Sequence, residues 1–468
     1  MTASEDFPQK QGVNVRMYRQ GHGDCFLIST RTADDNPCHV LIDCGYFRGS
    51  LRVPRMCDVT ENIRDTVRGQ LDLVVLTHEH ADHLNGITER RFQDILVSEA
   101  WLAWTEDPQD RFARMLRKKH NDELLQLLRV RKGLCSRLGA NASELQRLND
   151  LLALETDTSH FAVSDPSRST NKRALAIIKT KSKTTYLNPG TVLNIPKTNI
   201  KAYVLGPPRK QILLGSEEPV DDELFSFNYS QDDPLRNQSH DNETSDEPFT
   251  GGRFQCIDSA MTNDEFLKSG YADESNKWRC IAGVSDWVKS AEKMALKLNT
   301  GINNTSLVLA LELPNTKKVL FFPGDAQRGS WVSWSRCRWS ADRGVVTARD
   351  LLANTVLYKV AHHGSHNATL DGCPTDNYPN LSWFGAGRFR DEFVVMLPAC
   401  EQWAKSTLAK PVAWEHPLPA IKDALMRKSL GRVLQTDECK NLHVGDDIWS
   451  GGLDVNDLYY DYFVRDGE

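Results

Sequence analysis

Three histidines and an aspartate stand within six consecutive residues of the stretch "LTHEHADHLNG" (76–86). The chain has only 13 histidines in 468 residues, so composition does not account for this density. Neutral imidazole and carboxylate groups are the ligands of zinc and similar divalent ions. His78 and His80 are two residues apart on a chain leaving a strand, so their side chains can face the same side. Asp82 and His83 follow a bend and can face a second ion, so the cluster predicts two adjacent metals.

Two later segments offer further ligands in matching contexts. "FFPGDAQ" places Asp325 at the end of an apolar strand, where a carboxylate can bridge two cations. "YKVAHHGSHNA" places His362 and His363 at the end of another apolar strand. Ligands at strand ends converge on one sheet edge, where rigid elements preorganise a site. Because side chains alternate along a strand, we expect only one of these two histidines to reach the metals, and we favour His362.

The elements that must position these ligands are short apolar runs separated by turns. "LDLVVLT" (71–77) is continuously apolar, as expected for a strand buried on both faces. The runs at 13–30 and 39–47 predict earlier strands. Two strands with "PNTK" between them predict a hairpin at 305–325, after a helix at 284–299. The pattern is that of an α/β protein.

Two stretches interrupt this pattern. Residues 107–155 carry leucines at helical spacing among many arginines and lysines, which predicts two or three amphipathic helices. We favour a packed insertion with solvated basic faces; the alternative is a cap that helps to bind a polyanion. Residues 215–250 are acidic and poor in aliphatic side chains, which predicts a surface loop. The expected division is a core half at 13–100, a helical insertion at 101–184, core strands at 185–208, a polar loop-and-helix insertion at 209–300, a second core half at 301–445 and a C-terminal tail at 446–468.

Composition excludes several protein classes. Hydrophobic residues make up 40% and charged residues 26%, a soluble globular balance. The net charge of −6 gives no global basic field for nucleic acid, although a local groove could still be basic. No apolar run reaches the ~18 residues that a membrane span needs, and the first residues do not form a signal peptide. The 11 cysteines form no CxxC pair, which argues against a zinc ribbon and a disulfide framework. We therefore expect a reduced, cytoplasmic protein with no membrane segment.

These motifs together resemble the metallo-β-lactamase superfamily of metallohydrolases, and most closely the ComEC-type hydrolase domain of bacterial competence proteins. The shared pieces are the HxHxDH cluster, a Gly-Asp pair at a strand end and a histidine 37 residues later. The ComEC-type pattern adds "GHGDCFLI" (21–28), "LIDCG" (41–45), "NNTSLVL" (303–309), "KVAHHGS" (359–365), His416-Pro417 and Thr436-Asp437. The insertions at 101–184 and 209–300 have no counterpart in that pattern.

The resemblance implies a four-layer αβ/βα sandwich, the metallo-β-lactamase fold, with a large helical insertion. The ligands it implies are His78 and His80 for a first ion, Asp82, His83 and His362 for a second, and Asp325 between them. Asp24 and Asp43 would orient histidines from behind. Asp82 would also orient the nucleophile, and His363 or His366 would protonate the leaving group. Further supporting or substrate-contacting roles are expected for Lys359, Ser365, Asn304 and His416.

One ligand of the family is missing. Many members carry a further histidine on the strand before the Gly-Asp strand, and that place falls here at "INNTS" (302–306). The first site then has only His78, His80 and Asp325, unless a neighbouring asparagine or His416 helps. The sequence therefore predicts one or two divalent ions, zinc or manganese, with the second site the more complete.

The expected chemistry is hydrolysis, because a bound divalent ion lowers the pKa of water to ~7. The resemblance favours a phosphodiesterase or nuclease, with nucleic acid or another phosphodiester as partner. The alternatives are a hydrolase of a small ester, lactone or phosphoester, and a catalytically weak scaffold of the same fold. A protein partner could bind through the helical insertion.

A tryptophan-rich segment offers a separate hypothesis for nucleic-acid contact. "WVSWSRCRW" (331–339) interleaves tryptophans with arginines, a mixture that can stack bases and contact phosphates. The helical spacing of Trp331 and Trp334 favours instead a helix that packs its aromatic side chains on the core.

Overall fold

The computed structural model describes residues 11–47, 50, 54–156, 169–225, 284–341, 344–406, 416–438, 449 and 451–467. The chain divides into two units: Met1–Phe225 with Ala291–Glu468, and Ser226–Ser290. The expected site residues all belong to the first unit. The predicted polar insertion at 209–300 falls largely on 226–283, which lies outside the described residues.

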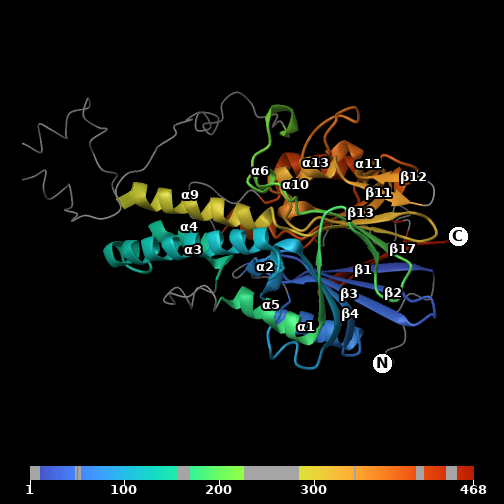
Figure 1. Ribbon diagram of the computed structural model, residues 1–468, viewed down its shortest axis with the longest axis horizontal. Helices are drawn as coiled ribbons and strands as arrows, with labels where there is room; N and C mark the ends of the chain where they lie inside the picture. The colour runs from blue at the N-terminus through green and yellow to red at the C-terminus, as the bar shows by residue number, and fades with distance from the viewer. Residues whose placement is uncertain are drawn as a thin grey trace, which may run out of the picture. The chain divides into compact units, whose positions relative to one another are not determined.

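Two large mixed sheets form the first unit (Figure 1). The first sheet has the order β16 (Leu453–Val455), β17 (Tyr459–Arg465), β1 (Gly12–Tyr18), β2 (Cys25–Arg31), β3 (Pro37–Cys44), β4 (Gln70–Leu76), β5 (Leu96–Ala103), β6 (Lys183–Leu187). The second has the order β15 (Val433–Gln435), β14 (Val394–Leu397), β13 (Thr355–Lys359), β10 (Val319–Phe322), β9 (Val308–Glu312), β8 (Lys201–Gly206), β7 (Val192–Asn194). β11 (Arg338–Ala341) and β12 (Gly344–Thr347) form a small third sheet. The expected hairpin is the antiparallel pair β9–β10.

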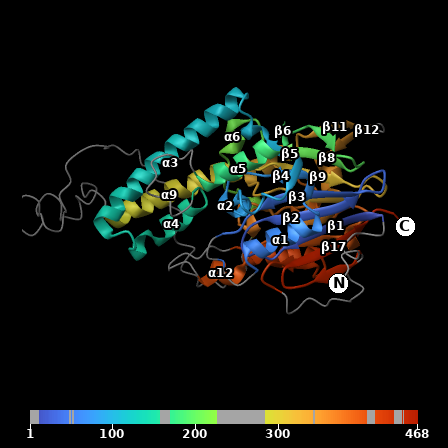
Figure 2. The ribbon, with the colours of Figure 1, turned by 90° about the horizontal axis from the view of Figure 1, so that it is seen from below.

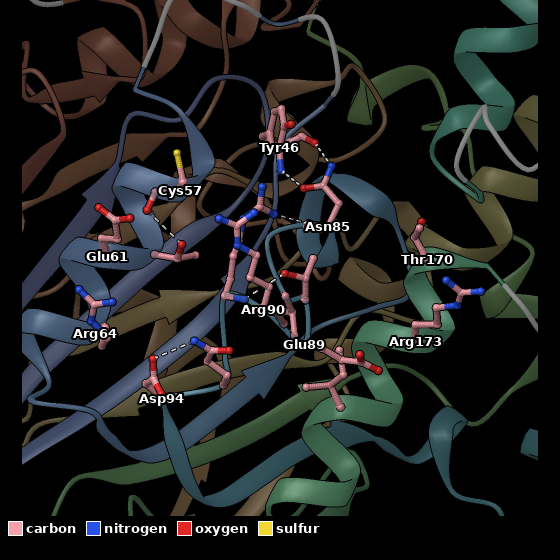
Figure 3. Close-up of a pocket in the computed structure, with 16 residues that line it drawn as sticks. Tyr46, Cys57, Glu61, Arg64, Asn85, Glu89, Arg90, Asp94, Thr170 and Arg173 are labelled. Carbon is pink, nitrogen blue, oxygen red and sulfur yellow. Dashed lines mark hydrogen bonds between the residues drawn. The ribbon is translucent and has the colours of Figure 1, made fainter.

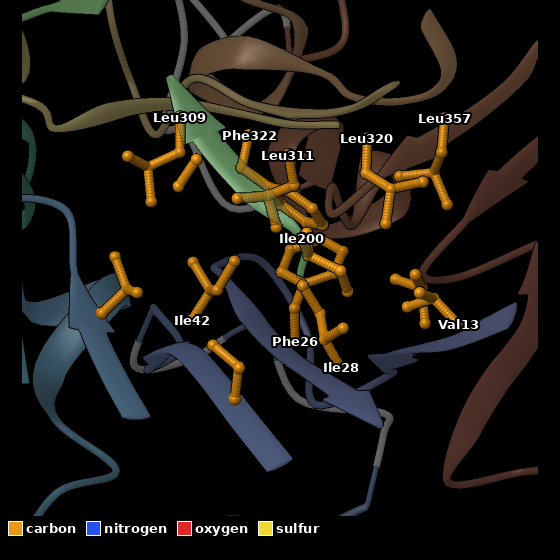
Figure 4. Close-up of a cluster of buried hydrophobic side chains, with 14 of the residues drawn as sticks. Val13, Phe26, Ile28, Ile42, Ile200, Leu309, Leu311, Leu320, Phe322 and Leu357 are labelled. Atoms are coloured by element: carbon orange, nitrogen blue, oxygen red, sulfur yellow. The ribbon is translucent and has the colours of Figure 1, made fainter. Parts of the chain in front are cut away.

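The main core lies between the two large sheets (Figure 4). On β2, Phe26 and Ile28 enter this core, while Leu27 enters the apolar layer on the other face of the same sheet. This alternation is the two-residue period of a strand, and both faces are apolar because both are covered. Leu309 and Leu311 of β9 meet the first sheet from the opposite side.

Helices cover the outer faces of the sheets (Figures 1 and 2). α1 (Met56–Thr66) and α5 (Thr170–Lys181) pack on the first sheet, and α10 (Arg328–Trp334), α11 (Ala348–Ala353) and α13 (Pro419–Lys428) pack on the second. The layers are thus those of an α/β sandwich. Trp331 and Trp334 of α10 are completely buried, so the core-packing alternative is correct for this helix.

The helical insertion contains α3 (Arg111–Leu138) and α4 (Gln146–Ala153), joined through a turn at Ser143–Leu145. The Asp110 side chain caps α3 by accepting from the Ala113 N–H, and α3 ends before Gly139, whose φ is +94°. From Ala291 onward, α9 (Val284–Asn303) runs beside both helices, and Asn299 Nδ2 donates to Leu151 O at 3.1 Å. Two or three amphipathic helices were expected at 107–155, and α3 and α4 are the two α-helices found there. α5, which lies further along the range expected as insertion, belongs to the layer over the first sheet.

The C-terminal residues were expected as a tail, but they complete the first sheet. β17 pairs with β1 along its whole length, from Gly12 opposite Arg465 to Tyr18 opposite Tyr459. The reason is an alternating apolar pattern, in which Tyr460, Tyr462 and Val464 are buried.

Short helical turns make up the remaining described elements. They are α2 (Ala81–Leu84), α6 (Gln211–Leu214), α12 (Glu401–Ser406) and the 3₁₀ turns η1 (Trp104–Glu106), η5 (Asp221–Glu223), η8 (Ala361–Gly364), η9 (Leu381–Trp383) and η10 (Arg390–Glu392). Within the described part of the chain, no helix combines the length and the apolarity that crossing a membrane requires.

Candidate metal centre

Five of the six predicted ligands meet at one edge of the two sheets. β3 and β4 run parallel, as do β10 and β13, so the carboxyl ends of each pair lie at a common edge. β3 carries Asp43 near its end, and β4 is followed within a few residues by the histidine cluster. Asp325 follows β10, and His363 follows β13. The side chains of His78, His80, Asp82, His83, Asp325 and His363 come together, and none of these residues is more than 4% exposed.

Glycines allow the loops to pack closely at this edge. A Cβ on Gly45 would lie 2.4 Å from the carbonyl carbon of Asp82, and one on Gly23 would lie 2.5 Å from Asp82 O. Gly23 also has a φ of +137°, which side chains rarely adopt. The "GHGD" and "LIDCG" motifs therefore let their backbones press against the segment that carries Asp82 and His83.

Three of the cluster histidines have their outer ring nitrogen held by the protein. His78 Nδ1 lies 3.0 Å from Thr77 Oγ1 and 3.2 Å from Ser306 Oγ. His83 Nδ1 donates to Asp43 Oδ2 at 2.8 Å. His363 Nδ1 donates to Pro398 O at 3.0 Å. A neutral imidazole has one donor and one acceptor nitrogen, so these contacts leave the Nε2 lone pairs of His83 and His363 available. The hydroxyl partners of His78 allow the same arrangement, because a hydroxyl can accept from its Nδ1.

Those Nε2 atoms face one carboxylate oxygen. Asp325 Oδ2 lies 3.2 Å from His83 Nε2, 3.4 Å from His363 Nε2 and 3.9 Å from His78 Nε2. Its other oxygen, Oδ1, is held by Lys359 Nζ at 3.2 Å. One oxygen of Asp325 thus lies between His78 on one side and His83 with His363 on the other.

Two further aspartates occupy opposite sides of the histidine rings. Asp82 Oδ2 lies on the Nε2 side, 3.1 Å from His363 Nε2 and 4.0 Å from His83 Nε2. Asp24 lies on the Nδ1 side of both rings, 3.7 Å away, and its Oδ2 pairs with Lys359 Nζ at 2.5 Å. Asp24, His83, Asp325 and His363 form a buried group that could hold a metal ion. Asp82 is not a member of that group, but its Oδ2 lies on the same Nε2 side of the two rings as Asp325 Oδ2.

The charge balance of the centre calls for cations. Four buried carboxylates, Asp24, Asp43, Asp82 and Asp325, face one permanent cation, Lys359. Burial disfavours charged imidazole, but the surrounding carboxylates outweigh it. They raise the pKa of His83 well above its ordinary value and that of His363 to about 9. Without metal the carboxylates are therefore neutralised by protons, which divalent ions would displace.

The pair His362–His363 differs from our expectation. His363 faces the carboxylates, whereas His362 is half-buried and lies beside Asn303, Gln327 and Asn367. The expectation assumed strand alternation, but β13 ends at Lys359, and both histidines have positive φ values of 44° and 53°. This turn directs His363 inward. His363 belongs to the group that could hold a metal ion, while its expected role as a proton donor stays a prediction.

The other predicted residues divide between the centre and its surroundings. His366 is about half exposed and pairs with Glu218 at 2.8 Å, so it lies outside the buried cluster. Asn304 braces neighbouring loops: its Nδ2 donates to Leu214 O, and its Oδ1 accepts from Gln327 N. Ser365 is buried in the turn after His363.

His416 lies near the turn that carries His363. Its ring stacks on His22 at 5.5 Å and an interplanar angle of 10°, and the His22 ring lies 4.3 Å from that of His363. His22 is thus a neighbour of the centre that was not among the expected site residues.

The sequence reasoning missed several groups that hold the ligands. Thr77 and Ser306 lie within the motifs given above, but the position of a hydroxyl residue in a motif does not indicate that it contacts a histidine. Pro398 contributes a backbone carbonyl, which has no signature in sequence. Glu155 belongs to the insertion, and its carboxylate lies 3.4 Å from His80 Nε2.

A pocket of about 920 Å³ borders the segment after α2 but includes no ligand of the cluster (Figure 3). Asn85 and Tyr46 line it, with Arg64 of α1 and Arg173 of α5 on opposite sides and Arg90 between them. Its lining also includes Arg91 and three carboxylates, Glu61, Glu89 and Asp94. We call it the arginine pocket.

Comparison with known proteins gives no relative from which to transfer a function. No protein-family model and no curated protein matches this chain. The candidate centre therefore has to be interpreted from its own geometry.

Proposed function

We propose that this chain is a metal-dependent hydrolase with a metallo-β-lactamase fold that cleaves phosphodiesters, using one or two zinc or manganese ions. The observation that carries the proposal is the common orientation of His78, His83 and His363. Each ring is held from behind by a protein acceptor and directs its other nitrogen toward Asp325 Oδ2. Histidines that bind metals are supported in this way.

The protein groups have separable roles in such a reaction. When bound, the ions would supply an activated water and stabilise developing negative charge. Lys359 holds Asp325 Oδ1 and so keeps Oδ2 directed at the histidines. Burial opposes ionisation of Asp82, but His83 and His363 lower its pKa to about 2, so it stays a carboxylate. Its Oδ1 makes no hydrogen bond to a described residue, which leaves it able to orient a water molecule.

The arginine pocket supports a phosphate-bearing substrate. It contains four arginines against three carboxylates, and Asn85 joins it to the ligand loop two residues after His83. Arginine matches phosphate geometry and supplies salt-sensitive attraction to a nucleic-acid backbone. The arginines of this pocket therefore give the phosphodiester proposal an advantage over small neutral esters.

The test is hydrolysis by purified protein loaded with Mn²⁺ or Zn²⁺. Substrates would be single- and double-stranded DNA, RNA and bis(p-nitrophenyl) phosphate. We expect cleavage that the double substitution Asp82→Ala, His83→Ala abolishes. Asp72→Asn is the matched control, because Asp72 is also a buried aspartate but pairs with Lys197 and His39 N, away from the centre.

Other outcomes would select another function. Cleavage of a lactone or simple ester, with all phosphodiesters left intact, would replace the phosphodiesterase proposal with the small-ester alternative. A metal-loaded protein without any hydrolytic activity would favour the scaffold alternative.

A further inference from the structure

The helical insertion is joined to the ligand loop through its backbone. Ala81 N donates to Leu154 O at 2.9 Å, directly after the end of α4. Asn171 of α5 strengthens the junction, because its Nδ2 lies 2.8 Å from Leu154 O and 3.0 Å from Glu79 O. The end of α4 is therefore fixed against the His-x-His segment, although Ala81 and Leu154 are 73 positions apart in sequence.

The next residue, Glu155, extends its carboxylate between a histidine of the insertion and a histidine of the centre. Oε2 accepts from His120 Nε2 of α3 at 3.0 Å, and Oε1 lies 3.4 Å from His80 Nε2. The Glu155 side chain is 4% exposed and that of His80 is 2% exposed. Among the described residues, neither Glu155 Oε1 nor His80 Nε2 has a hydrogen-bond partner elsewhere. Two buried polar atoms thus face each other.

This contact determines how the His80 ring can act. Its other nitrogen, Nδ1, lies 3.1 Å from His78 Nε2. If Nε2–H faces Glu155, the Nδ1 lone pair points to the same place as the His78 Nε2 lone pair. Glu155 Oε1 can serve as the acceptor, because a carboxylate oxygen accepts hydrogen bonds and His120 already occupies the other oxygen, Oε2.

We propose that Glu155 is a positioning residue of the metal centre, which fixes the His80 ring so that Nδ1 joins His78 Nε2 in holding the first ion. His120 holds Glu155 in turn, so the insertion supports the site in which one expected histidine is missing. The inference rests on the proposed metal-dependent function and assigns the insertion a part in it.

The test measures metal affinity rather than turnover. Zn²⁺ would be titrated into metal-free protein against a chromophoric chelator, and Co²⁺ absorption would report ligand geometry. We expect Glu155→Gln to lower the affinity for one ion 10–100-fold, which is the usual effect of losing an orienting partner. The affinity for the other ion should stay unchanged. Glu144→Gln is the control, because it makes the same carboxylate-to-amide change at an exposed position of the same insertion. This variant should bind metal as the wild type does. Thermal unfolding in EDTA checks that each variant folds.

A double-mutant cycle separates positioning from a general structural effect. If Glu155 acts through the His80 ring, adding Glu155→Gln to His80→Ala should cause no further loss of affinity. The same 10–100-fold loss in both backgrounds would overturn the inference, as would wild-type affinity in the single variant. A wild-type protein that binds no divalent ion would instead refute the proposed function, and this inference with it.

Discussion

Asp43→Asn keeps the shape of a side chain that supports the centre but removes one of its hydrogen-bond acceptors. Asp43 Oδ1 accepts from Thr77 N at 2.8 Å, while Oδ2 accepts from Thr77 Oγ1 at 2.6 Å and from His83 Nδ1 at 2.8 Å. Asparagine has nearly the same shape and tolerates the φ of 53° found here. It has only one acceptor oxygen, however, and its NH₂ group can only donate.

The size of the expected loss of metal affinity follows from the tautomer of His83. If the amide oxygen keeps the bond to Thr77 N, the NH₂ group faces His83 Nδ1, which must then accept. The proton moves to Nε2, the nitrogen that faces Asp325 Oδ2 and that would otherwise bind an ion. Losing such a partner typically costs 10–100-fold in metal affinity, or about 1.4–2.7 kcal/mol. The metal-free fold should also lose about 1.5–3 kcal/mol for each lost hydrogen bond to the charged carboxylate.

The assay is competitive Zn²⁺ titration, combined with urea unfolding of the metal-free protein. Asp72→Asn is the control, because it removes a buried carboxylate that accepts from a backbone N–H without touching a histidine ligand. Both variants should lose stability, and only Asp43→Asn should lose metal affinity. Equal affinity in the two variants would refute the argument that Asp43 sets the His83 tautomer.

Three further predictions follow from the same geometry. His363→Ala should abolish binding of the second ion, whereas His362→Ala should retain it, as measured by metal content after gel filtration; the reverse result would restore the original expectation of His362. The pKa of His363 is raised from 6.5 to about 9, so its contribution to the stability of the metal-free protein is fully present below pH 6.5 and is lost as the pH rises through about 9. Zn²⁺ affinity should rise over the same range, because the metal competes with the proton for this ring. Unfolding and Zn²⁺ titration from pH 6 to 9.5 test both trends, and a flat affinity profile would contradict them. Gly45→Ala should lower both the melting temperature and the metal content, because its Cβ would approach the Asp82 backbone to 2.4 Å; unchanged values would show that this close packing is unimportant.

The strands and the cluster could be predicted because their signals are local. Continuous apolar runs such as β4 and the density of ligands after it need no tertiary information. The direction of His363 could not be predicted, since it depends on two consecutive left-handed residues after the strand has ended. The C-terminal strand β17 was missed because Tyr459 and Phe463, on its less buried face, are also aromatic, so the regular alternation in burial is hard to see in the sequence.

The supports of the ligands form a second group that sequence alone does not reveal. Asp43 was expected because it lies in a quoted motif, whereas Glu155 comes from an insertion without a recognisable pattern. The contact between Glu155 and His80 joins residues 75 positions apart and exists only because α3 and α4 return the chain to the ligand loop. Such contacts depend on packing, which spacing rules do not encode.

The most direct test of the account is the metal content of the purified protein, measured by elemental analysis beside Asp325→Ala. Asp325 is decisive because one of its oxygens faces His78, His83 and His363 together. We predict one or two zinc or manganese ions per wild-type chain and a clear loss in a folded Asp325→Ala variant. A wild-type protein without bound divalent metal, even after incubation with Zn²⁺ or Mn²⁺, would contradict the central claim that this cluster is a metal centre.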